Sequence, residues 1–176
     1  MDILPKLKGK LFVGIKYGHD GVNVAMSIAV KTDEDRVFIE SIDCQSVRNG
    51  NHWILNFLMN TNIQSIVIDG ANGQSILTKE MASYKIKKPI LPTVKEVIEA
   101  NALFEQGIFA KNICHTGQPS LNNVVTNCEK RAIGTNGGFG YKNIKEGAEG
   151  ALLDSIIYAY WVCLTFKKAQ KQRANY

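Results

Sequence analysis

Two aspartates lie in apolar surroundings where a carboxylate needs a partner. Asp69 ends the run "SIVID" and is followed at once by Gly70, while Asp154 lies between "ALL" and "SIIYAYW". An unpaired carboxylate in a protein core costs several kcal/mol, so each is expected to be paired, metal-bound or at an edge. Asp69 is otherwise explained as a helix cap or turn residue, and Asp154 by a salt bridge to a lysine or arginine.

Together the two aspartates point to metal chemistry. Carboxylate oxygens are the ligands that Mg²⁺ or Mn²⁺ prefers, and such ions recruit a phosphate as a further ligand. In a two-metal site, one ion activates water and the other stabilises the leaving oxygen of a phosphodiester. This chemistry normally uses at least three acids. Glu149, five residues before Asp154, lies near enough to the start of the same helix to assist.

The third acid is expected from the first strand, but "LFVGIK" ends there in Lys16. A protonated lysine cannot ligate a metal, and beside Asp69 it would form an ion pair that fills the site. Asp20, in the glycine turn four residues later, is the nearest substitute. His19 is a second candidate, although loop histidines without a function are more common.

The elements that must position these residues begin with three strands and continue with alternating helices and strands. Apolar runs and period-two alternation predict the strands, and helical spacing predicts the helices. Asn49 or Asn51 is available to cap the first helix, and Thr93 with Glu96 forms a capping box. The predicted strands cover 11–16, 22–30, 36–42, 65–70, 89–91 and 107–110, and the helices 49–60, 72–85, 93–107, 119–132 and Ala148 to Lys171.

This order predicts an α/β fold with a mixed sheet, in which an antiparallel meander precedes parallel strands and helices flank both. It is the element order of the ribonuclease H-like fold. Asp69 would then lie at the carboxyl edge of parallel strands, where open α/β sheets place their sites.

Composition predicts a single domain over residues 1–176, with a basic tail from about residue 167. A formal net charge of +5 and a pI of about 9.0 favour an anionic partner. The four cysteines form no CxxC pair, which fits a reducing cytoplasm. The N-terminus has no apolar signal region and Asp154 interrupts the longest apolar stretch, so we expect a soluble intracellular protein without membrane contact.

The sequence resembles the nuclease domain at the C-terminal end of the large terminase subunit of tailed bacteriophages and prophages. The resemblance covers nearly the whole chain. It is carried by the order and spacing of "LFVGIKYGHDGVNVAMSIAV", "SIVIDGANGQSILTKEM", "EVIEANALFEQGIFAKNICHTGQPSLNNVVTNCEKRAIGTNGGFGY" and "EGALLDSIIYAYW".

The resemblance implies a metal-dependent endonuclease that cuts concatemeric double-stranded DNA during genome packaging in the host cytoplasm. Asp69 and Asp154 match the family's second and last catalytic aspartates. Lys16 stands where the first is expected, which implies impaired cleavage and indicates an introduced substitution, a diverged prophage copy or a role for Asp20. The terminase ATPase domain, the small subunit and the portal are the implied partners. No GxxxxGK[ST] phosphate loop is present, so the motor domain is absent from this chain.

Further residues are accessory candidates. His115 resembles a terminase position, although it could equally cap the following helix. Lys85, Lys87 and Lys88 are candidate DNA contacts, as are Arg131 and Lys142, which flank the glycine-rich "GTNGGFGY". The simpler explanation of the lysines is a solvated basic face. The simpler explanation of the glycine-rich segment is an ordinary surface hairpin.

Two other functions stay open. One is a nuclease of the same fold with another substrate, such as a Holliday-junction resolvase. The other is a catalytically inactive DNA-binding or assembly module, which Lys16 favours.

Overall fold

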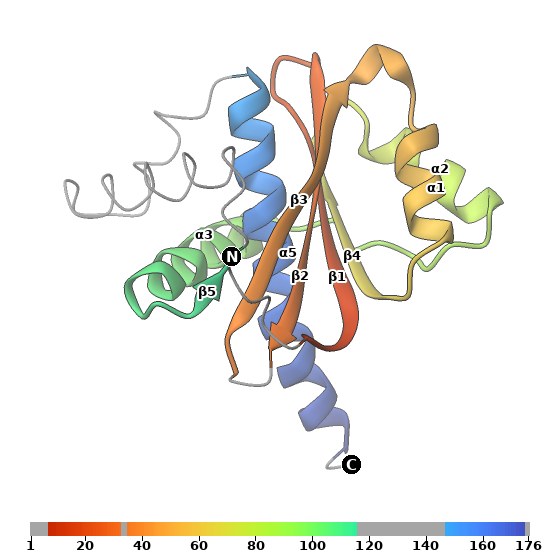
Figure 1. Cartoon of the computed structure of the whole chain (residues 1–176). Coiled ribbons are helices and arrows are strands. Elements are labelled where there is room, and N and C mark those ends of the chain that lie inside the picture. The colour runs from red at the N-terminus through yellow and green to blue at the C-terminus, as the bar shows by residue number, and fades with distance from the viewer. Residues whose placement is uncertain (1–6, 33–34, 116–146, 175–176) are drawn as a thin grey trace, which may run out of the picture.

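The computed structural model describes residues 7–32, 35–115 and 147–174 and arranges them in layers around one sheet (Figure 1). In chain order the elements are β1 (Leu7–Tyr17), β2 (Asn23–Thr32), β3 (Val37–Ser46), a 3₁₀ turn (Val47–Asn49), α1 (His52–Met59), β4 (Ile63–Asp69), α2 (Gln74–Ser83), α3 (Val94–Phe109), β5 (Ile113–Cys114) and α5 (Gly147–Ala174).

The sheet formed by the described residues has the strand order β4-β1-β2-β3-β5. The pairs β1–β2 and β2–β3 are antiparallel, whereas β4 is parallel to β1 and β5 is parallel to β3. The antiparallel meander β1–β2–β3 is thus followed, after α1, by the strand β4, which pairs in parallel with β1. This confirms the mixed sheet flanked by helices that the sequence predicted.

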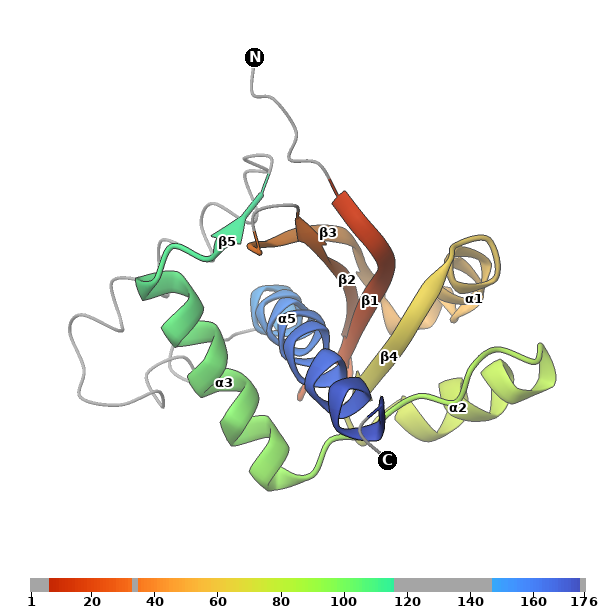
Figure 2. The same ribbon diagram turned by 90° about the horizontal axis from the view of Figure 1, so that it is seen from below.

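Helices cover both faces of the sheet, and β1 contributes side chains to both layers. Figure 2 shows α5 against one face with α3 outside it, and α1 and α2 beyond the other face. Because side chains alternate along a strand, Val13, Ile15 and Tyr17 pack in the core on the α1–α2 side. Phe12 packs in the core on the α5 side, so the alternation also turns Lys16 toward α5.

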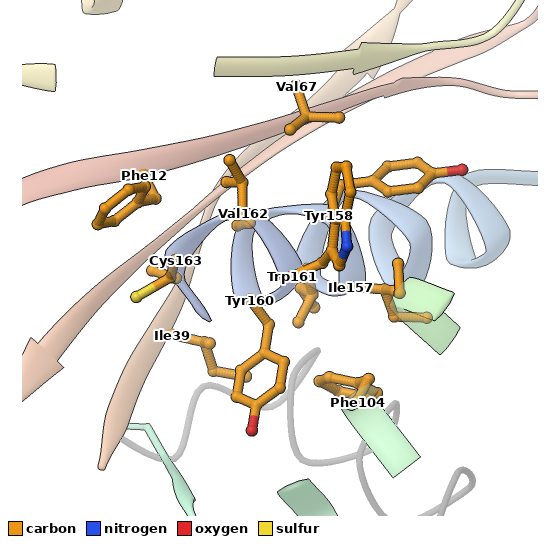
Figure 3. Close-up of a cluster of buried hydrophobic side chains, with 14 of the residues drawn as sticks. Phe12, Ile39, Val67, Phe104, Ile157, Tyr158, Tyr160, Trp161, Val162 and Cys163 are labelled. Carbon is orange, nitrogen blue, oxygen red and sulfur yellow. The ribbon is translucent and has the colours of Figure 1, made fainter. Parts of the chain in front are cut away.

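The core on the α5 side surrounds that helix (Figure 3). Residues 150–163 of α5 are all buried, which is expected of a helix lying between a sheet and another helix. Tyr160 meets Phe104 of α3 edge-on, with ring centroids 5.7 Å apart. Asp154 is therefore held on a helix that is enclosed on several sides.

The α1–α2 layer contains a hydrogen-bonded chain from the end of β1. The Tyr17 hydroxyl donates to Asn51 Oδ1 at 2.6 Å, and Asn51 Nδ2 donates to Glu80 Oε1 at 2.6 Å. Burial first, and then the charge of Glu80, raise the pKa of Tyr17, while its hydrogen bond to Asn51 acts in the opposite direction. This chain ties β1, α1 and α2 together.

The predicted helix boundaries were partly wrong. The capping box is present, since Thr93 N donates to Glu96 Oε1 and Glu96 N donates to Thr93 Oγ1. However, the helix does not end at Gly107 but continues to Phe109, because Gly107 lies buried against Tyr160 of α5 and serves close packing. The predicted strand 107–110 is consequently the last turn of α3.

The structure also differs from two smaller predictions made from the sequence. Asn51 occupies the position before α1, but its side chain makes no capping bond because it joins Tyr17 to Glu80. Residues 89–91 form no named strand, and Ile90 makes only an isolated parallel bridge to Val67. The predicted helix 119–132 and "GTNGGFGY" lie outside the described residues. Among those described, no helix is long and apolar enough to cross a membrane.

Candidate active site at the carboxyl edge of β1 and β4

Lys16 and Asp69 meet because they are register partners on two parallel strands. Their Cα atoms pair across β1 and β4, and Val67, two residues before Asp69, packs in the core on the α5 side. The period of two therefore turns Asp69 toward α5 with Lys16. Lys16 Nζ donates to Asp69 Oδ2 at 2.9 Å. The ion pair that the sequence predicted for these residues is confirmed.

The chain leaves this edge through Gly70, whose backbone requires a glycine. Its φ of 116° lies in a region that other residues rarely adopt. A Cβ at this position would also meet the Tyr17 backbone, with the carbonyl oxygen at 2.5 Å. The sharp turn after Asp69 thus keeps the strand end close to the end of β1.

α5 brings Asp154 to the same place through a close helix–strand contact. A Cβ on Gly14 would collide with the Ser155 carbonyl and the Ala159 nitrogen, so only glycine lets α5 lie this near to β1. Ser155 Oγ donates to the Leu152 carbonyl at 2.7 Å and lies 2.7 Å from Ser27 Oγ, which fixes the helix on β2 as well.

In this position Asp154 Oδ2 lies 4.0 Å from Lys16 Nζ. Both aspartates approach the same Lys16 ammonium group. The distance between Asp69 Oδ2 and Asp154 Oδ2 is therefore at most the sum of their distances to Lys16 Nζ. The two acids predicted to converge do so. The contact to Lys16 is also the salt bridge offered above as the simpler explanation of Asp154.

Tyr158 is a site residue that the sequence analysis did not single out. It follows Asp154 by one helical turn, and its hydroxyl donates to Asp69 Oδ2 at 2.6 Å. The spacing of four residues from Asp154 was the available signal, since it places both side chains on one helix face. Burial first, and then the nearby Asp154 and Asp69, raise the pKa of Tyr158, so this phenol keeps its proton and remains a donor.

The electrostatics of the cluster favour an ionised Asp69. Burial alone would raise its pKa, but hydrogen bonds from Tyr158 and Lys16, the Lys16 charge and the Gly70 backbone together hold the pKa below its usual value. Lys16 is only 4% exposed and Asp154 only 6%. Two carboxylates and one ammonium therefore face each other largely out of water.

A pocket of about 100 Å³ opens beside this cluster. It brings Asp20 and His19 into the same site, as proposed from the sequence, although Asp69 is not among its lining residues. Asp20 also stabilises its own turn, since its Oδ1 accepts from Val22 N at 2.9 Å. The pocket is lined by Lys16, Gly18, His19, Asp20, Gly150, Ala151 and Asp154.

His115, another predicted site residue, lies elsewhere. His115 follows β5, which pairs with the first residues of β3, whereas Lys16 is aligned through Ala25 with Cys44 near the end of β3. The histidine is therefore at the opposite end of the sheet, and burial lowers its pKa. Glu149 lies in the first turn of α5.

The candidate DNA-binding lysines lie away from the pocket. Lys87 Nζ donates to the Gln64 carbonyl at 3.0 Å, near the start of β4, whereas Asp69 ends that strand. Five residues of strand put about 16 Å between these positions. Lys85 and Lys88 are exposed nearby in the chain. Arg131 and Lys142 lie outside the described residues.

The arrangement does not fit two divalent cations. Within the described ranges no group of three or more His, Cys, Asp or Glu side chains could hold a metal. The space between Asp69 and Asp154 is taken by the Lys16 ammonium. Asp154 and Asp20, which both line the pocket, are of the oxygen-ligand type that suits one Mg²⁺ or Mn²⁺.

No protein-family model and no curated protein matches the chain. Among solved structures, it is similar to the yeast mitochondrial Holliday junction resolvase Ydc2, with 12% sequence identity and a TM-score of 0.37. The alignment covers 91% of this chain and 84% of the resolvase.

Proposed function

We propose that this chain is a DNA endonuclease domain of the kind found at the C-terminal end of the large terminase subunit. It would hydrolyse phosphodiester bonds of double-stranded DNA with Mg²⁺ or Mn²⁺ as cofactor. The observation that supports this most is the convergence of Asp69 and Asp154, 85 residues apart in sequence, at the carboxyl edge of β1 and β4. In a packaging complex the natural substrate is concatemeric DNA, and the partners are the ATPase domain, the small subunit and the portal.

Each side chain of the site would have a separate role. Asp154 and Asp20 would hold the divalent cation in the pocket, and that cation would supply positive charge at the scissile phosphate and activate water. Lys16 would favour the ionised form of Asp69 and add a second fixed positive charge. Tyr158 would hold Asp69 in its orientation through the 2.6 Å hydrogen bond.

The pocket lining suits a phosphate rather than a base. Lys16, Asp20 and Asp154 could contact a phosphate directly or through a divalent cation. Contacts of this kind read no sequence, so we expect cleavage with little sequence preference.

The remaining lysines are suited to holding the duplex. Lys87 contacts Gln64 near the start of β4, about 16 Å along the strand from Asp69, and Lys85 and Lys88 are exposed next to it in the chain. One turn of DNA is about 34 Å long, so a duplex across this side of the molecule would reach both places. The formal charge of +5 supports such sequence-independent binding.

A plasmid-nicking assay tests the proposal. We expect Lys16→Asp, which restores a third acid, to nick supercoiled plasmid in Mn²⁺ faster than the wild-type chain. Adding Asp69→Asn or Asp154→Asn to that variant should abolish nicking. Asp35→Asn is the matched control, because Asp35 is exposed in the β2–β3 turn and its φ of 62° suits asparagine. Equal activity of all these variants would refute the site.

One observation favours a second function, a DNA-binding or assembly module without cleavage. Lys16 lies between the acids, where a catalytic cation would be needed. In that case the wild-type chain would shift labelled duplex DNA in a salt-dependent way while neither it nor Lys16→Asp cuts any DNA. A synthetic four-way junction in the same assay tests for a resolvase-like preference.

A further inference from the structure

The Lys16 ammonium has the surroundings that a bound cation would have. It is 2.9 Å from Asp69 Oδ2 and 4.0 Å from Asp154 Oδ2, and its side chain is 5% exposed. A charge this deeply buried is expected only where opposite charges compensate it. Each of the three groups comes from a different element, namely β1, β4 and α5.

The backbone fixes the ammonium at this position. Lys16 and Asp69 are paired in register on adjacent strands. Next to Lys16 on the other side, β2 presents Ala25, a small and fully buried residue. α5 is held over β1 and β2 by the Gly14 contact and the Ser27–Ser155 hydrogen bond. A lysine here is therefore part of the core and not a surface side chain that reaches the site by chance.

We infer that Lys16 is the built-in cation of this site, taking one of the two places that divalent ions occupy in a two-metal nuclease. Its charge, in place of a metal, holds Asp69 and Asp154 together, so the site assembles without any divalent ion. The site then has room for one exogenous cation, which enters from the pocket on the Asp154 side. This inference deepens the proposed function and rests on it for its catalytic meaning.

The same geometry predicts that removing the Lys16 charge destabilises the folded chain. Without Lys16, Asp69 and Asp154 would face each other as two carboxylates, with Asp154 almost entirely out of water. A divalent cation could then enter the vacated space, since both acids already point to it. The Lys16 ammonium and a divalent cation should therefore be able to occupy the same position between the two acids, but not at the same time.

Thermal unfolding in EDTA and in millimolar Mn²⁺ tests this substitution. The wild-type Tm should rise only slightly in Mn²⁺, through the one cation that the pocket can take. Lys16→Met, similar in length but uncharged, should lose about 10 °C or more in EDTA and recover most of it in Mn²⁺. Lys79→Met, on the exposed side of α2, is the matched control and should match the wild type in both.

A double variant keeps the test decisive if Lys16→Met does not fold. Lys16→Met/Asp154→Asn removes the more deeply buried acid, whereas Asp69 keeps its Tyr158 hydrogen bond and is 24% exposed. We expect this variant to fold in EDTA, to be more stable than Lys16→Met there and to respond little to Mn²⁺.

Three results would overturn the inference. The first is a Lys16→Met protein as stable in EDTA as the wild type. The second is a wild-type Tm that rises in Mn²⁺ as much as that of Lys16→Met. The third is a double variant no more stable in EDTA than Lys16→Met. These readouts need no cleavage, so the role of Lys16 can hold although plasmid nicking fails, and nicking can be observed although this role is refuted.

Discussion

Lys16 and Asp69 are cross-strand partners at the carboxyl edge of β1 and β4, joined by an ion pair of 2.9 Å. Parallel strands end at one edge, so the last side chains on the same face of two neighbours must meet. The pair is thus a direct product of strand register. Asp154 joins it only because α5 crosses β1 at Gly14.

The Gly14 contact should be indispensable for this crossing. Gly14→Ala places a methyl group against the α5 backbone, which cannot give way as a side chain can, and we expect about 2–3 kcal/mol of destabilisation. Gly50→Ala is the control, because its Cβ would meet nothing within 4 Å, although its φ of 78° adds some strain. Chemical denaturation measures both. A Gly14→Ala protein less affected than Gly50→Ala would contradict the close crossing.

Tyr158 should control the ionisation of Asp69. Tyr158→Phe removes the hydroxyl that donates to Asp69 Oδ2, so the pKa of Asp69 should rise toward or above its usual value. We also expect about 1.5–3 kcal/mol of lost stability, the range for a hydrogen bond to a charged group. Carboxyl-carbon NMR titration follows the pKa, and Tyr84→Phe at an exposed tyrosine is the control. An unchanged pKa would show that the hydroxyl does not act on Asp69.

Stability should fall at acid pH through Asp69. Its pKa is lower in the folded chain than in the unfolded one, where it is about 3.9. The contribution is therefore fully present well above pH 4 and is lost as pH falls through the folded value. Denaturation as a function of pH should show a shallower acid loss for Asp69→Asn than for the wild type. Parallel curves would mean that the folded site does not favour the ionised form.

Stability should also fall at alkaline pH through the buried tyrosines. Burial raises the pKa of Tyr158 and Tyr17, so both stay protonated in the folded chain. This contribution is complete below the unfolded value of about 10 and is lost as pH rises above it. Tyrosinate absorbance and circular dichroism should change together for these residues. Their full ionisation in a still folded chain would disprove the burial.

DNA affinity should depend on salt through the basic residues near the start of β4. Lys87→Gln and Lys88→Gln should each weaken binding to any duplex equally and reduce the slope of log K against log salt by about 0.9 per lost phosphate contact. Fluorescence anisotropy measures this, with the exposed Lys10→Gln as control. Unchanged slopes for both variants would place the DNA elsewhere.

The sequence was most informative where pattern and chemistry agreed. The meander, the helices and the strand ending in Asp69 have clear periodicities, and two carboxylates in apolar runs indicated the candidate site. The ion pair with Lys16 also followed from chemistry, since a lysine at the end of the neighbouring strand has few other partners.

The errors have a common physical cause, which is that tertiary contacts override local signals. Gly107 looked like a helix stop, but it serves packing against Tyr160. Asn51 looked like a cap, but its amide joins Tyr17 to Glu80. Tyr158 was not among the candidate residues, and only the folded chain places its hydroxyl on Asp69. Such roles depend on a partner far away in the sequence, which no local window contains.

The end of β1 serves two layers through consecutive residues, because Lys16 binds the acids under α5 while Tyr17 binds Asn51 on the opposite side. A shift of this strand tip would disturb both attachments at once. The lysine thus cannot be withdrawn by moving the backbone without also loosening α1 and α2. Rotation of the Lys16 side chain, by contrast, would open the site to a second ion without disturbing the attachment of Tyr17 to Asn51.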